Sequence, residues 1–209
     1  MQSATEQVGS LLQLLREAFA DPLGSGACRA EERSSGPRAP LGQFLLGCFN
    51  CNSVKGRKDV SDDDVLWPDQ HNTNLAIEYS SGGFVRASNR LDDGLSRRAG
   101  GLIELVGLDR HGARGWPSPT ARDQRWPQRE EVWAAAERCR SDFESLGVSD
   151  EAIGLVLEAA KGYGFFSVWM TVFGGHAAVR RALIEGFPGT AHSCFNDEGE
   201  AVRRPGAIL

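Results

Sequence analysis

The segment from Cys48 to Gly56 constrains this chain more than any other part of its sequence. It reads Cys-Phe-Asn-Cys-Asn-Ser-Val-Lys-Gly. Two cysteines three positions apart, on a turn or at the start of a helix, can point their sulfurs at one metal ion. One pair supplies only half of a tetrahedral zinc site, and a cysteine away from a metal is usually a small buried apolar residue. Cys48 and Cys51 are therefore candidate ligands of a structural zinc ion, with burial in a core as the alternative.

Composition limits the class of protein. The chain has 209 residues, of which 41% are hydrophobic and 24% charged, so a packed core is expected. The formal net charge is -5, whereas nucleic-acid binders usually carry a basic surface. Any contact with DNA would therefore depend on local basic patches or on a partner protein. The odd number of cysteines, the lack of a long apolar run and the lack of a leading signal pattern predict a cytoplasmic protein that has no membrane partner.

The apolar pattern predicts three regions, with borders after residues 42 and 110. In residues 1–42, a helix at 3–20 leads into an irregular stretch rich in Gly, Ser, Pro and Arg. Residues 43–110 contain two strands, at 75–79 and 84–87, which a glycine-containing loop joins into a hairpin. A helix at 95–109 follows this hairpin.

The region from 111 to 209 is predicted to be mainly helical after a loop that reaches residue 127. One helix is expected to end at Gly147, and Ser149 is expected to cap the next. The segment Phe165 to Phe173 is apolar on all sides, which predicts burial. A last helix is expected from about His176 to Glu185. The predicted fold class is α+β.

The string Cys-x-x-Cys-Asn-x-x-Lys-Gly resembles the final element of HNH nucleases, specifically the group found with retrons and with Septu-type antiphage systems. In that group a hairpin ends in a His that acts as general base, and a Trp-x-Asn segment leads into an apolar turn before the helix that bears the string. Here Phe44 to Cys48 fits the turn. The similarity covers roughly residues 43–110, because Trp67-Pro68-Asp69, the hairpin and the following helix fall where this group has similar features.

The resemblance implies a small, incomplete ββα-metal unit near residues 43–60, and cleavage of DNA with Mg²⁺ or Mn²⁺ in an antiphage defence system. It also implies a partner ATPase. In such a site a neutral His takes a proton from the attacking water while the metal holds the phosphate. Asn52 would then be the metal-side residue, and Lys55, Arg57 and Lys58 would contact phosphate groups. The alternative for these three basic residues is a solvated helix end.

The sequence departs from this family upstream of Cys48. No His precedes Cys48, no earlier Cys-x-x-Cys pair occurs, and Gln43 stands where the family has an Asn that orients the base. Three explanations compete. The chain is an inactive descendant that serves in interaction or nucleic-acid binding, or His71 supplies the base, or the reading frame upstream of Phe44 is shifted. The third explanation arises because the codons of Leu41 to Phe44, read one base later, can spell Trp-Asp-Asn.

A few other residues are weaker candidates for contact with nucleic acid. Arg97 and Arg98 on the predicted helix, and His111 in the following loop, could each face a phosphate backbone. An exposed, solvated surface explains them at least as well. His71, in a polar loop, has the same alternative. The sequence therefore leaves open whether the protein is an active hydrolase.

Overall fold

The computed structural model describes residues 48–209, of which 49–209 form one compact unit. The helix predicted at 3–20, the irregular stretch after it and Gln43 lie outside the described residues. Residues 49–209 contain seven α-helices and one two-stranded antiparallel sheet, which confirms the predicted α+β class. No helix in this described part is long and apolar enough to cross a lipid bilayer.

The predicted hairpin is present. Strand β1 (Ile77–Ser80) pairs with β2 (Phe84–Ala87), and Ile77 lies opposite Ala87. The connection η2 (Ser81–Gly83) contains two glycines with positive φ angles, as a tight turn requires. The first strand starts two residues later than predicted, because Asn72 caps a short helix, α3 (Thr73–Ala76), by accepting a hydrogen bond from the Asn74 amide.

Helix α4 (Asp93–Val106) covers one side of the hairpin. Asp92 accepts a hydrogen bond from the Leu95 amide at its start, and Gly107 ends it in the left-handed conformation. A first hydrophobic cluster joins α4 to the hairpin and to residues 65 and 66. A Cβ atom at Gly101 would lie under 3.0 Å from the Asp64 carbonyl oxygen, so this glycine lets the preceding loop run against the helix.

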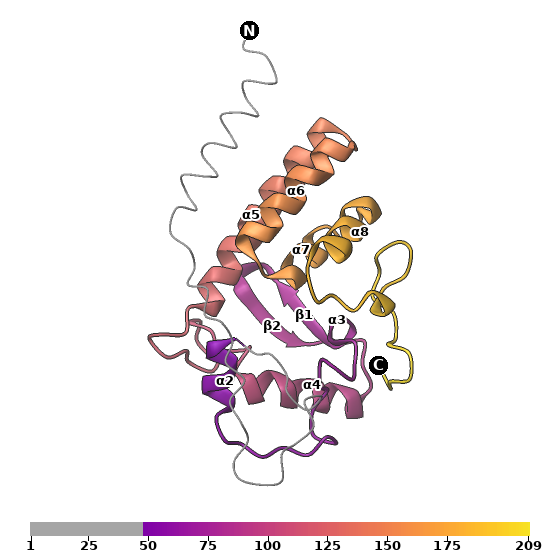
Figure 1. The fold of residues 1–209 in the computed structure, drawn as a ribbon. Coiled ribbons are helices and arrows are strands. Elements are labelled where there is room, and N and C mark those ends of the chain that lie inside the picture. The colour runs from indigo at the N-terminus through magenta and orange to yellow at the C-terminus, as the bar shows by residue number, and fades with distance from the viewer. Residues whose placement is uncertain (1–47) are drawn as a thin grey trace. The chain divides into compact units, whose positions relative to one another are not determined.

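Four helices follow and build a second hydrophobic cluster. They are α5 (Arg125–Leu146), α6 (Asp150–Tyr163), α7 (Phe166–Val172) and α8 (Ala177–Gly186). As predicted, α5 ends at Gly147 and Ser149 caps α6. The apolar segment around α7 is buried, with Trp169 and Phe173 fully enclosed. Figure 1 shows the hairpin between α4 on one side and these helices on the other.

Residues after α8 return to the hairpin. The buried Asn72 side chain donates hydrogen bonds to the carbonyl oxygens of Cys194 and Val202, each at 2.7 Å. The backbone amide of Asn72 donates to the Leu209 carbonyl oxygen at 3.0 Å. One asparagine, 2% exposed, thus fastens three positions of the last segment to the start of α3.

Candidate functional site

The segment that carries the sequence motif forms a helix, α2 (Phe49–Lys55), which packs against α4. Cys51 and Asn52 are half-buried on it, and Cys48 precedes it and is exposed. The helix ends at Gly56, whose amide donates to the Asn52 carbonyl oxygen at 2.8 Å. Lys55 lies in the last turn of α2, where the negative end of the helix dipole stabilises its positive charge. Arg57 and Lys58 follow the helix and are exposed.

Arg125, the first residue of α5, holds α2 in place. Its Nη1 donates to the Cys51 sulfur at 3.3 Å and to the Val106 carbonyl oxygen at 3.0 Å. Its Nη2 donates to the Gly107 carbonyl oxygen at 2.9 Å. These are carbonyl groups at the end of α4, which have no partner inside their own helix. One guanidinium therefore joins three helices at a single point.

A buried carboxylate balances this guanidinium. The Asp123 carboxylate accepts hydrogen bonds from Arg125 Nε at 2.7 Å and from Nη2 at 2.6 Å, which makes a bidentate ion pair. Asp123 is 4% exposed and Arg125 is 7% exposed. The hydrogen bonds from Arg125 hold the pKa of the Asp123 carboxyl below its usual range. Arg129, one turn further along α5 and 3% exposed, donates to the carbonyl oxygens of Gly83 and Leu108. The start of α5 is thus a buried cationic hub that positions α2, the end of α4 and the hairpin turn.

Sequence reasoning missed this hub, although a signal for it exists. Arg125 and Arg129 continue, at helical spacing, the buried stripe that Val132 and Ala136 occupy on α5. A charged residue on a buried stripe is rare unless it is paired. Extending the apolar stripe backwards by two turns would have identified both arginines as buried.

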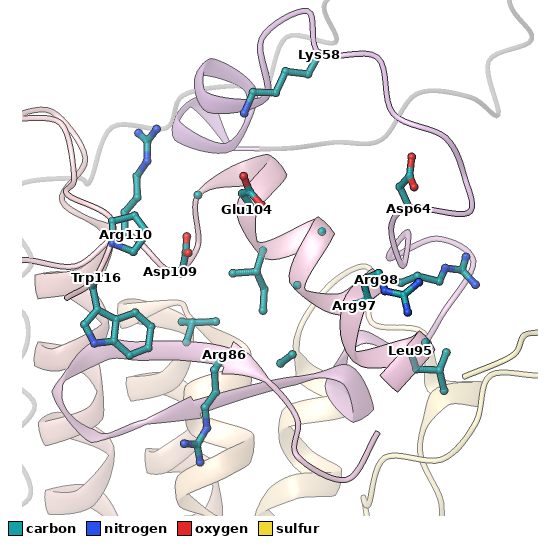
Figure 2. A pocket seen from close by; sticks show the side chains of 18 of the residues that line it. Lys58, Asp64, Arg86, Leu95, Arg97, Arg98, Glu104, Asp109, Arg110 and Trp116 are labelled. Carbon is teal, nitrogen blue, oxygen red and sulfur yellow. The ribbon is translucent and has the colours of Figure 1, made fainter. Parts of the chain in front are cut away.

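An open groove of about 1180 Å³ runs along α4 and over β2. Five basic side chains line it: Lys58, Arg86, Arg97, Arg98 and Arg110. Figure 2 shows Arg110 and Trp116 at one end, Arg97 and Arg98 at the other, and Glu104 and Asp109 between them. Five carboxylates also contribute to the lining, so the groove has mixed charge rather than a continuous basic surface.

Two residues expected on the surface have structural contacts instead. Arg98 donates to the carbonyl oxygens of Asp62 and Val65, so it fastens the loop that precedes the hairpin. His111 is buried, not exposed, because its ring stacks on Phe84 with ring centroids 4.0 Å apart. Its Nδ1 accepts from the Ala113 amide, and its Nε2 lies 2.8 Å from the Gly82 carbonyl oxygen. The surface interpretation of His111 is therefore wrong, and its ring serves the packing of the hairpin turn.

His71 is also buried rather than solvated, with 7% of its surface exposed. Neither ring nitrogen has a hydrogen-bond partner within the part of the chain that the structure describes. Burial, with Arg98 and Arg204 nearby and Asp69 opposing them, lowers the pKa of this imidazole. Arg98 precedes Gly107 by nine helical residues, which is about 14 Å along α4. His71 therefore has Arg98, Asp69 and Arg204 as its charged neighbours, whereas Asn52 lies on the helix that Arg125 joins to the end of α4.

This burial predicts a stability that depends on pH. Because its pKa is lowered in the folded protein, His71 binds a proton less readily there than in the unfolded chain, where its pKa is near 6.5. The unfolded state therefore binds more protons, and the free energy of unfolding should fall as the pH drops from about 7 to about 5. Urea unfolding of the wild type and of His71→Leu measures this: the wild type should lose stability more steeply over that interval. Exposed His192→Gln is the control and should keep the wild-type slope, whereas equal slopes in all three proteins would contradict the assignment to His71.

Comparisons with protein-family models, with curated proteins and with solved structures found no match to this chain. Its function is therefore inferred from α2, the Arg125 hub and the groove along α4.

Proposed function

We propose that this chain takes part in metal-dependent cleavage of DNA phosphodiester bonds, as a subunit of an antiphage defence system that includes an ATPase. The observation that carries the proposal is α2 itself. The segment that resembles the HNH helix is a helix, and its half-buried Cys51 is held by a buried arginine. Such anchoring fixes the position of Asn52, and fixed geometry is what a phosphoryl-transfer site requires.

On this proposal, the described residues would supply only one side of such a site. The amide oxygen of Asn52 is a suitable ligand for Mg²⁺ or Mn²⁺. Residues 48–209, however, contain no group of three or more His, Cys, Asp or Glu that could hold a metal ion. For the same reason, a structural zinc ion at Cys48 and Cys51 stays a prediction.

The groove along α4 supports a role in strand binding. It begins close to α2, since Lys58 and Gly107 both contribute to its lining, and its basic side chains reach to Arg97. Phosphate groups bind guanidinium and ammonium groups through charge-assisted hydrogen bonds. The carboxylates in the same groove limit the affinity, which fits a subunit that relies on a partner for DNA capture.

A nicking assay tests the proposal. Purified full-length protein, alone and with its partner ATPase, is incubated with supercoiled plasmid and Mg²⁺ or Mn²⁺. Asn52→Ala should lower the nicking rate by at least about 100-fold, because it removes a group that acts on the reacting phosphate. Asn89→Ala, at an exposed loop position, should retain the wild-type rate. Cleavage by Asn52→Ala at the wild-type rate would reject the site.

The second candidate is a catalytically inactive, HNH-derived protein that binds nucleic acid or another protein. The surroundings of His71 favour it, because its charged neighbours Arg98, Asp69 and Arg204 are not among the residues seen to hold α2. The wild type would then retain labelled DNA in a gel-shift assay without cutting it, with or without the ATPase. Cleavage that depends on Asn52 would eliminate this candidate.

A further inference from the structure

A second, smaller cavity of about 210 Å³ lies away from α2, among β1, α7, α8 and the segment after α8. Its polar lining is made by Asn74, Tyr79, Ser167, Thr171 and Arg180. Its apolar wall comes mainly from Ile77, Met170 and Phe195. A liquid water molecule takes about 30 Å³, so the cavity has room for about seven waters or for a small organic ion.

Arg180 is the charged group of this cavity, and its charge is poorly compensated. Its Nη1 donates to the Gly174 carbonyl oxygen at 3.3 Å, while its Nε is buried and has no partner in residues 48–209. No ion pair of Arg180 occurs in that part of the chain, although the exposed Glu200 is near enough to act on it electrostatically. Burial lowers the pKa of the guanidinium, which nevertheless stays charged at neutral pH. A half-buried cation with an orphaned N–H indicates a missing acceptor.

Neutral polar side chains line the rest of this cavity. The Asn74 side-chain amide gives one N–H to the Asn72 side-chain oxygen at 3.2 Å and keeps a second. The hydroxyls of Tyr79 and Thr171 are already engaged, since Tyr79 hydrogen-bonds the Ser167 side chain and Thr171 donates to the Ser167 carbonyl oxygen. The site therefore combines a positive charge with an available amide N–H beside an apolar wall.

We propose that this cavity binds a small oxyanion, either a phosphate group or the carboxylate of a short carbon chain. The Arg180 guanidinium would meet two oxygens in its planar fork, as it does with carboxylate and phosphate elsewhere. The second N–H of the Asn74 side-chain amide would add a further hydrogen bond to the oxyanion. The apolar wall formed by Ile77, Met170 and Phe195 suits the carbon chain of a carboxylate.

Isothermal titration calorimetry on the full-length chain tests this site. Inorganic phosphate and butanoate are titrated separately at constant ionic strength, with chloride as the reference anion. We expect at least one of them to bind with a Kd of about 1 mM or below. Binding of phosphate alone or of butanoate alone identifies the ligand class, and either outcome supports the site.

Matched variants locate the binding. Arg180→Gln should weaken it by at least about tenfold, since it removes a charge-assisted bond worth about 1.5 kcal/mol or more. Arg181→Gln changes the adjacent arginine, which is exposed and donates to the Asp197 carbonyl oxygen, and should bind like the wild type. Asn74→Ala removes one donor and should weaken binding several-fold, and it tests the site if Arg180→Gln does not fold. Absence of binding by both anions, or binding that Arg180→Gln and Asn74→Ala leave unchanged, would overturn the proposal.

Discussion

Replacing Asp123 by alanine should lower the free energy of unfolding by about 3–5 kcal/mol, because it leaves the Arg125 guanidinium buried without its counter-charge. The carboxylate receives two short hydrogen bonds from Arg125, and solvent cannot replace them at a residue that is 7% exposed. A loss of this size is a large share of the 5–15 kcal/mol that typically stabilises a domain. Chemical denaturation at pH 7, monitored by tryptophan fluorescence, measures it.

A double variant separates the ion pair from other effects. Asp123→Ala with Arg125→Met removes both charges and fills the space with an apolar chain, so it should recover part of the stability lost in the single variant. It should also loosen α2, because the hydrogen bond to the Cys51 sulfur is lost. A loss below about 1 kcal/mol in Asp123→Ala would show that the pair behaves like an exposed one.

Gly83→Ala is expected to cost about 2–5 kcal/mol, for two reasons that add. Its φ angle of 77° lies in the left-handed region, which costs a residue with a side chain about 1–2 kcal/mol. The added Cβ would also lie under 3.0 Å from the Trp126 carbonyl oxygen, where α5 crosses the hairpin turn. The backbone cannot move aside as the end of a side chain can. Overpacking of this kind typically costs about a further 1–3 kcal/mol.

Gly115→Ala is the matched control for this prediction. Gly115 also has a positive φ angle, of 91°, but no atom lies within 4 Å of an added Cβ. It should therefore show the backbone cost alone, about 1–2 kcal/mol. Thermal unfolding followed by circular dichroism compares the two variants, and equal losses would mean that the close contact between α5 and the turn contributes nothing.

The local elements of the fold could be predicted because short-range physics determines them. Gly147 and Ser149 mark a helix end and a helix start through their own backbone and hydroxyl chemistry. The start of β1 could not be placed from propensity, because the Asn72 side chain caps a short helix there. That cap depends on contacts with residues more than 120 positions away, which no local pattern reveals.

The site was less predictable than the fold. The motif suggested a helix after Cys48, and the structure has one, but the arginine that bonds its Cys51, Arg125, lies 74 residues further along the chain. Burial of His71 and His111 also depends on distant segments rather than on their polar neighbours in sequence. Buried polar residues are the hardest to place from a sequence, since their partners are set by tertiary structure.

The contacts of Asn72 have a consequence for synthesis. The N-terminal part of a chain leaves the ribosome first. Asn72, the hairpin and α4 therefore emerge long before Cys194 and Val202. Until those two carbonyl groups arrive, the Asn72 amide must remain solvated and the hairpin edge must remain uncovered. Completion of this unit is therefore a late event of translation, and the nascent hairpin is the part that a chaperone would find exposed.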